Sequence, residues 1–303
     1  MTIRNSLRVT VVVSTMLALG CGATPSQGDP STEAETEAFL TPRLGVLTTT
    51  NRFIVKEGGL YSGWTDEGAF LGSGESLAGS RIGKVDPNHH GYVKDGELNS
   101  GWTDEYGQAY NVLLSGNRIG VIDNLFFDFY VKEGGLTGSW TKEFSDVLEG
   151  VLSGNRIGVL TSNRDFLVKE GGLSASWDNE FSNVRWGVLS GDRIGVLTTD
   201  GLFKVKSGAL NASWTDEHDH VIQGVLSGGR IGVLLDDNRF LVKEGDLSSF
   251  WVEQMQNVTS IALSGTRIGA VSNGHCYVKE GAIDSTDWDD VWNGAYQCIL
   301  PTD

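Results

Sequence analysis

The stretch VRWGVLSGDRIGVLTTDGLFKVKSGALNASWTDE, residues 184–217, contains four short runs of strand-forming residues separated by turn formers. The pairs Gly191-Asp192 and Asp200-Gly201 stand between apolar runs, which is a strong β-hairpin signal. The expected strands are residues 186–190, 193–197, 202–206 and 212–215, with a polar loop at 216–220. No window has the 3.6-residue apolar period of an amphipathic helix. The stretch therefore predicts a unit of four antiparallel strands.

This unit occurs seven times at a spacing of 37 or 38 residues. An Arg-(Ile/Leu)-Gly motif begins at Arg43, Arg81, Arg118, Arg156, Arg193, Arg230 and Arg267. A lysine, usually in Val-Lys-Glu-Gly, follows at Lys56, Lys94, Lys132, Lys169, Lys206, Lys243 and Lys279. A tryptophan completes each copy at Trp64, Trp102, Trp140, Trp177, Trp214, Trp251 and Trp288. Four strands per copy in a tandem array are typical of β-propeller blades, and a parallel solenoid is the alternative.

The two ends of the repeat region favour the propeller. Residues 296–303 align with residues 221–228, the first strand of the sixth copy, whereas the first copy lacks such a strand. Joining the two ends closes a ring and removes exposed sheet edges, while a solenoid would need end caps. We therefore expect an all-β, seven-bladed β-propeller of four-stranded antiparallel blades over residues 39–303, closed by the C-terminal strand.

The N-terminal part predicts export. Residues 1–20 combine Arg4 and Arg8 with a short apolar run, as a signal peptide does. Cys21 follows Gly20 at the end of that run, which resembles the lipobox of bacterial lipoproteins; ordinary cleavage near Ala23 is the alternative. Residues 21–38 hold acids, Pro, Ser and Thr and no Lys or Arg, so we expect a disordered tether. These features predict a protein in the bacterial cell envelope, on the outer membrane or cell surface, held to a membrane by its lipid anchor alone.

Composition narrows the function. The chain has 23 Lys and Arg against 39 Asp and Glu, a formal charge of −16, which disfavours nucleic-acid binding. It contains no glycine-flanked nucleophile, HExxH or phosphate-loop motif. His218-Asp219-His220 occurs in one copy, and we interpret it as a polar loop and not a metal site. We expect no enzyme activity, no cofactor and no metal.

The repeated residues have structural and functional interpretations. We expect a tryptophan ring to cover the glycine two after each arginine, so the tryptophans are packing residues or, alternatively, sugar-stacking platforms. The arginines are expected to hold loop carbonyls or carboxylates between blades, with ligand binding as the alternative. Glutamates three after a tryptophan are interpreted as a solvated rim that pairs weakly with lysine or arginine. These glutamates are Glu67, Glu105, Glu143, Glu180 and Glu217.

Cys276 and Cys298 remain as an even pair if Cys21 carries lipid. Cys276 begins the third strand of copy seven, and Cys298 lies in the closing strand. A disulfide would lock the ring where its ends meet, provided that the two Cα atoms come within about 7 Å. Two separate thiols are the alternative.

The blade pattern resembles the tectonin and tachylectin propeller repeats. The residues that carry this resemblance are 151–154, 156–160, 166–171 and Trp177 in copy four. The resemblance implies a lectin that binds glycans through repeated sites, with the seven tryptophans and five glutamates as candidate ligand-binding residues. A protein-interaction platform on the bacterial surface is the alternative. It would depend on atypical copies, such as Asn88-His89-His90 in copy two or residues 125–130 in copy three. A closed ring needs no partner copy, so we expect a monomer.

Overall fold

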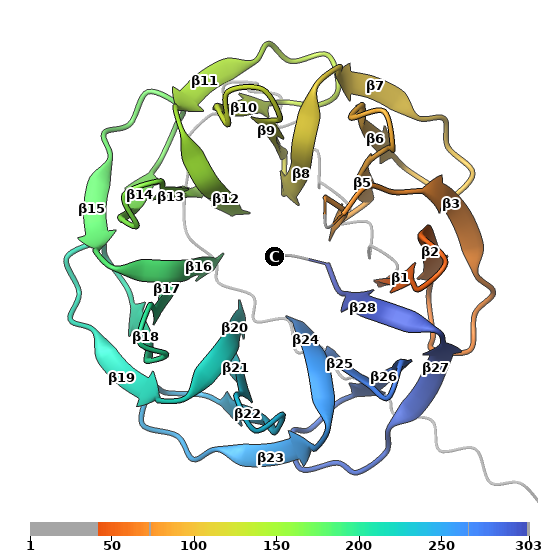
Figure 1. The fold of residues 1–303 in the computed structure, drawn as a ribbon, viewed down its shortest axis with the longest axis vertical. Helices are drawn as coiled ribbons and strands as arrows, with labels where there is room; N and C mark the ends of the chain where they lie inside the picture. Colours follow the sequence, from red (N-terminus) through yellow and green to blue (C-terminus); the bar gives the residue numbers. More distant parts are fainter. Residues whose placement is uncertain (1–41, 73, 266, 302–303) are drawn as a thin grey trace, which may run out of the picture. The chain divides into compact units, whose positions relative to one another are not determined.

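The computed structural model describes residues 42–72, 74–265 and 267–301, and within them all regular structure is β-strand. Twenty-eight strands form seven four-stranded antiparallel sheets. The sheets are arranged as blades around a central axis, with one strand of each blade at the centre and one at the rim (Figure 1). The predicted seven-bladed β-propeller is confirmed.

The strands follow one order in every blade, from the centre to the rim. Blade 1 contains β28 (Ala295–Ile299), β1 (Arg43–Thr48), β2 (Arg52–Glu57) and β3 (Thr65–Ala69). Blade 2 contains β4 (Ser76–Ala78), β5 (Arg81–Val85), β6 (Gly91–Asp95) and β7 (Thr103–Tyr106). Blade 3 contains β8 (Ala109–Ser115), β9 (Arg118–Asp123), β10 (Phe129–Glu133) and β11 (Thr141–Phe144). Blade 4 contains β12 (Val147–Ser153), β13 (Arg156–Thr161), β14 (Phe166–Glu170) and β15 (Asp178–Phe181).

The remaining blades repeat this order. Blade 5 contains β16 (Val184–Ser190), β17 (Arg193–Thr198), β18 (Phe203–Ser207) and β19 (Thr215–His218). Blade 6 contains β20 (Val221–Ser227), β21 (Arg230–Leu235), β22 (Phe240–Glu244) and β23 (Val252–Met255). Blade 7 contains β24 (Val258–Ser264), β25 (Arg267–Ser272), β26 (His275–Glu280) and β27 (Asp289–Asn293).

Blade 1 is built from both ends of the described chain. The C-terminal strand β28 pairs with β1 in antiparallel register, with Cys298 opposite Val46. Cys298 is joined by a disulfide to Cys276 of blade 7, and the two Cα atoms lie 5.9 Å apart. The closing strand thus completes the first blade, as the alignment of residues 296–303 predicts.

The fourth strand of each blade begins later than expected. In blade 5 it is β19, Thr215–His218, and not residues 212–215, so part of the predicted polar loop is strand. The reason lies in the preceding connection, where the buried Lys206 donates a hydrogen bond to the carbonyl of Leu210. The chain must wrap around this ammonium group before it can rejoin the sheet.

The apolar core is divided among seven clusters, each between two neighbouring blades. The prediction that tryptophan covers the repeated glycines is wrong. An added Cβ at Gly158 would meet the ring of Phe166 at 2.9 Å and Leu189 of the next blade at 3.3 Å. Phenylalanine covers the glycine because it stands on the adjacent strand of the same blade, whereas tryptophan precedes the outer strand.

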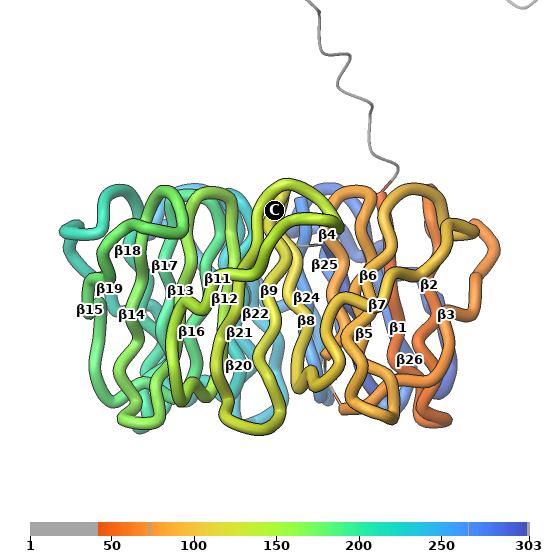
Figure 2. Tube along the Cα trace, turned by 90° about the horizontal axis from the view of Figure 1, so that it is seen from above, coloured from red at the N-terminus to blue at the C-terminus, as the bar shows by residue number. Residues whose placement is uncertain are grey.

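The ring has two faces, which are visible edge-on in Figure 2. We call face A the face formed by the loops between blades and the loops from the second to the third strand. Face B carries the turns from the first to the second strand and the loops from the third to the fourth. The predicted signal peptide, Cys21 and the tether lie outside the described residues. In the described part, no helix is long and apolar enough to cross a membrane.

Candidate functional site

A buried lysine stands at every seam between blades. Its ammonium group donates to a carbonyl four residues later, as Lys279 Nζ does to Ile283 O at 2.9 Å. The same ammonium lies 4.5–5.2 Å from the centre of the tryptophan ring in its own blade. The tryptophans are half-buried and pack on the seven core clusters. Each tryptophan therefore has a structural role, because its indole ring is the cation–π partner of the lysine and covers a core cluster.

The five repeated glutamates also lie in the seams, so their interpretation as a solvated rim is wrong. Each carboxylate forms an ion pair with the lysine of the next blade, as Glu67 does with Lys94 at 2.5 Å. The five pairs are Glu67–Lys94, Glu105–Lys132, Glu143–Lys169, Glu180–Lys206 and Glu217–Lys243. These carboxylates are only 1–3% exposed. The sequence analysis predicts a polar loop at Glu217, so neither the strand that carries this glutamate nor its contact with the next blade was predicted.

Two seams lack the carboxylate. Between blades 6 and 7, Gln254 takes its place and donates to Ile283 O at 3.0 Å. Between blades 7 and 1 the equivalent residue is Val291, which packs on the apolar cluster there. Burial lowers the pKa of Lys56 and of Lys279, the two lysines without a carboxylate partner, and a neighbouring arginine adds to the effect.

The repeated arginines hold carbonyls across the seams, as expected. Arg267 of blade 7 donates to Gly58 O of blade 1 at 2.7 Å and pairs with Glu280 of its own blade at 2.6 Å. Equivalent bonds from Arg43, Arg118, Arg156, Arg193 and Arg230 reach Gly96, Gly171, Gly208, Gly245 and Gly281. These side chains are buried, so their guanidinium groups are used within the ring.

The histidines do not assemble a metal site. His90 pairs with Asp104 at 2.7 Å, and His275 pairs with Asp290 at 2.8 Å in another blade. His220 pairs with Asp236 at 3.1 Å. Among the residues that the structure describes, no group of three or more His, Cys, Asp or Glu side chains could hold a metal ion.

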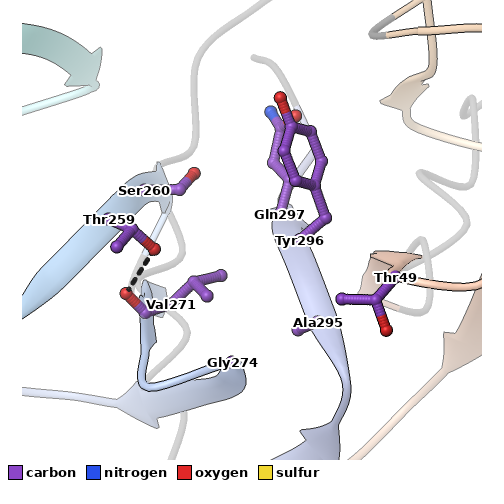
Figure 3. A pocket seen from close by; sticks show the side chains of 8 residues that line it. All are labelled: Thr49, Thr259, Ser260, Val271, Gly274, Ala295, Tyr296 and Gln297. Atoms are coloured by element: carbon purple, nitrogen blue, oxygen red, sulfur yellow. Dashed lines mark hydrogen bonds between the residues drawn. The ribbon is translucent and has the colours of Figure 1, made fainter.

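Face A is hollowed where the ring closes. A cavity of about 270 Å³ lies between β24 and β25 on one side and β28 on the other (Figure 3). Thr259 donates to Val271 O at 3.3 Å in its wall, and the half-exposed Tyr296 stands at its edge. Its lining holds hydroxyl and amide groups but no ionisable acid or base except Tyr296, so it offers no acid–base pair for catalysis.

The central channel is mainly apolar. A cavity of about 240 Å³ is lined by inner strands of blades 4 to 7 and of blade 1. Trp186 is 43% exposed and lines this cavity together with Gln223 and Gln297. Gln223 makes two hydrogen bonds of 3.1 Å with the backbone of Ile261 in the next blade. Glu149 holds the equivalent place in blade 4 and accepts from Gly187 N at 3.3 Å; burial raises its pKa to about 8.

Face A also carries an atypical loop between β9 and β10. The carboxylate of Asp123 accepts hydrogen bonds from the backbone N–H groups of Leu125 and Phe126, at 3.0 and 2.7 Å. Phe127 adopts a left-handed backbone with φ of 54°, and its carbonyl accepts from Val147 N at 2.9 Å. The loop is therefore held in one conformation from both ends.

This conformation turns apolar side chains outward. Leu125 is 62% exposed, Phe126 71% and Phe127 42%. Tyr110 contacts the Phe127 ring edge-on with a centroid distance of 5.7 Å, and Leu148 follows Val147 at the start of β12. We call these five residues, Tyr110, Leu125, Phe126, Phe127 and Leu148, the apolar patch.

The sequence pointed to part of this patch. Residues 125–130 were singled out as unusually aromatic, but Phe129 and Tyr130 belong to β10, and Phe129 is fully buried. Tyr110 and Leu148 were missed. Both stand eight residues before a repeated arginine, where blade 6 also has the apolar Ile222, so this position alone does not identify the patch.

Comparisons with known proteins extend only to the fold. No family model matches the chain, and no curated protein matches it. The structure of Kap60 bound to yeast RCC1 (Prp20) matches with a TM-score of 0.59 and 9% identity, covering 88% of this chain and 86% of that chain. Prp20p from Saccharomyces cerevisiae gives 0.56 and 9%, covering 67% and 70%. Human WBSCR16 gives 0.55 and 8%, covering 79% and 88%. At these identities the likeness shows a shared propeller fold.

Proposed function

We propose that this chain is a non-catalytic binding protein whose face A docks a protein partner through the apolar patch. The observation that carries the proposal is the loop at Leu125–Phe127, which displays three apolar side chains to solvent from a fixed backbone. Exposed apolar clusters of this kind mark interaction sites on soluble proteins. The partner expected here is a protein segment that presents apolar side chains.

The energetics of Phe127 support this proposal. A bulky residue at positive φ costs about 1–3 kcal/mol. Neighbouring blades place Asn51, Arg164 or Gly201 at the equivalent position. Phe127 gains only partial burial in return, since its ring is 42% exposed. Burying one aromatic side chain in an interface is worth about 1.5–3 kcal/mol, which would repay the strain only in a complex.

The solved neighbours give further support. Prp20p is described with binding properties to Gsp1p and histones, and RCC1 was solved with Kap60 bound. Other propellers of this fold are therefore described with protein partners.

We also propose that the ring is displayed at a bacterial envelope membrane as a monomer. The support is the apolar run ending at Cys21 and the acidic, proline-containing segment 21–38. An acylated Cys21 would hold the protein to the bilayer through two or three chains.

Carbohydrate binding is the second candidate function. The observation that favours it is Trp186, an exposed aromatic residue that lines the same cavity as Gln223 and Gln297. An aromatic face with neighbouring amide groups is a combination that suits a sugar ring.

Selection of binders to this protein from a displayed peptide library would test whether the apolar patch docks a protein segment. Peptides enriched by the wild type should bind the double variant L125D/F126D at least about tenfold more weakly. The matched control is F250D, because Phe250 is 91% exposed but lies on face B. Binding that survives in L125D/F126D would contradict the proposal that the apolar patch docks the partner.

A glycan-array screen tests the second candidate function. Sugar-competed binding that is lost in W186A and kept in L125D/F126D would favour carbohydrate binding.

A further inference from the structure

The seam between blades 1 and 2 differs from the others in the residue that stands against the tryptophan of the following blade. The residue four after each tryptophan lies against the tryptophan of the following blade, with ring centroids 5.5–5.9 Å apart at five seams. The pairs are Tyr106–Trp140, Phe144–Trp177, Phe181–Trp214, His218–Trp251 and Trp292–Trp64, and Met255 packs in one cluster with Trp288. Between blades 1 and 2 the equivalent residue is Gly68.

A lysine takes part of the space of the missing side chain. Gly68 has φ of +107°, a backbone that disfavours any other residue, and an added Cβ there would meet Lys84 Nζ at 2.9 Å. Lys84 therefore lies against Trp102 where other seams have a ring from the preceding blade. A hollow of about 340 Å³ remains there. It is lined by Ala69, Lys84, Asp86, Pro87, Tyr92 and Trp102. Two aromatic rings and a proline therefore surround a space of about the size of one small ring compound.

Lys84 gives this cavity a positive charge. Five other blades carry valine at its position, namely Val46, Val121, Val159, Val196 and Val233. Its ammonium lies 4.4 Å from the centre of the Trp102 ring and donates to the carbonyl of Glu67 at 2.5 Å. The Glu67 carboxylate is taken by Lys94. Asp86 accepts with Oδ1 from the backbone N–H groups of Asn88 and His90, and with Oδ2 from the side-chain amide of Asn88. Within the described residues, Lys84 has no carboxylate within ion-pair distance.

We propose that this cavity binds a small planar carboxylic acid. The ring of the ligand would lie in the hollow beside Lys84, against Trp102 and Tyr92. Its carboxylate would accept a hydrogen bond from Lys84 Nζ, which still has protons to donate. The site is independent of the apolar patch, because the patch belongs to blades 3 and 4.

Calorimetric titration of the full chain with 4-hydroxybenzoate and its neutral isostere 4-hydroxybenzamide tests the proposal. The acid should bind at least about tenfold more tightly than the amide, the effect of one charge-assisted hydrogen bond. K84V should abolish that preference, and it should fold because valine is the residue of five other blades. K84Q, which keeps the length of the side chain, should also lose the preference.

The matched control is K204V, which removes a lysine at a seam that Phe181 already fills. It should leave the preference for the acid unchanged. Equal affinity for acid and amide, absence of binding by both probes, or a preference that persists in K84V and K84Q would each overturn the assignment.

Discussion

Cys276 of blade 7 forms a disulfide with Cys298 of blade 1. At the seam between blades 5 and 6, the equivalent positions are occupied by Phe203 and Gly224, which are in contact. An added Cβ at Gly224 would meet the Phe203 ring at 2.4–2.7 Å, so glycine is required there by the close approach. At the closing seam, a disulfide thus stands where another seam has a contact between a phenylalanine ring and a glycine. The disulfide therefore adds a covalent link at the place where the strand pair β28–β1 closes the ring.

Removal of this disulfide should destabilise the ring. The bond closes a segment of 22 residues, for which the expected loss in the free energy of unfolding is about 3 kcal/mol. Urea unfolding of C276S/C298S, compared with the wild type with and without reductant, measures it. The matched variant C276F/C298G restores the pair used at the other seam and should recover part of the loss. An unchanged unfolding midpoint in reductant would contradict the prediction.

Glu149 should make stability depend on pH. Burial raises its pKa to about 8, with no charged neighbour contributing. When protonated, Glu149 can both donate and accept, as Gln223 does toward Ile261. A raised folded-state pKa means that this contribution is complete below the unfolded pKa near 4.5 and is lost as pH rises through about 8. E149Q should therefore be more stable than the wild type at pH 9, by about 1 kcal/mol, and nearly equal at pH 6.

The melting temperature measured from pH 6 to 9 checks this prediction. The reciprocal variant Q223E is the control and should acquire a pH dependence of the same sign. If E149Q and the wild type lose the same stability between pH 6 and 9, Glu149 does not titrate as inferred.

The buried ion pairs should be costly to break from one side. In E180A, Lys206 would stay buried without its carboxylate, and a loss of about 3 kcal/mol is expected. D178A is the matched control, because Asp178 is exposed on the same strand and should change stability by less than about 0.5 kcal/mol. Chemical denaturation of the two variants distinguishes a buried seam carboxylate from an exposed carboxylate on the same strand. Equal effects would contradict the seam assignment.

The sequence predicted the fold well because the fold depends on periodicity. Seven spaced motifs and hairpin turns define the strands, and the likeness of residues 296–303 to 221–228 predicts the closing strand β28. The seam contacts were predicted less well. Strand periodicity tells which side chains share a side of a sheet, but not which side chain of the next blade they meet. The sequence therefore predicts a solvated rim position for Glu180 and a tryptophan over the repeated glycine, whereas the structure has a buried ion pair at Glu180 and phenylalanine over Gly158.

The candidate sites depend on departures from the repeat, and the sequence contains those departures. Gly68 replaces an aromatic residue, Lys84 replaces valine, and Phe127 stands where other copies have Asn, Gly, His or Arg. Each departure is visible in an alignment of the copies. Its meaning is not, because only the structure shows that Gly68 and Lys84 share one cavity and that Phe127 has positive φ.

Replacement of Phe127 by asparagine should stabilise the fold and weaken peptide binding. Asparagine tolerates positive φ and occupies this position at Asn51 and Asn238. F127N should therefore raise the free energy of unfolding by about 1 kcal/mol while weakening patch-dependent peptide binding. R164N is the matched control, since Arg164 has φ of 65° at the same position of blade 4. It should gain stability similarly and bind normally. Urea unfolding and peptide titration of both variants give the answer, and an F127N variant that binds as well as the wild type would show that the strain at this residue is not maintained for the patch.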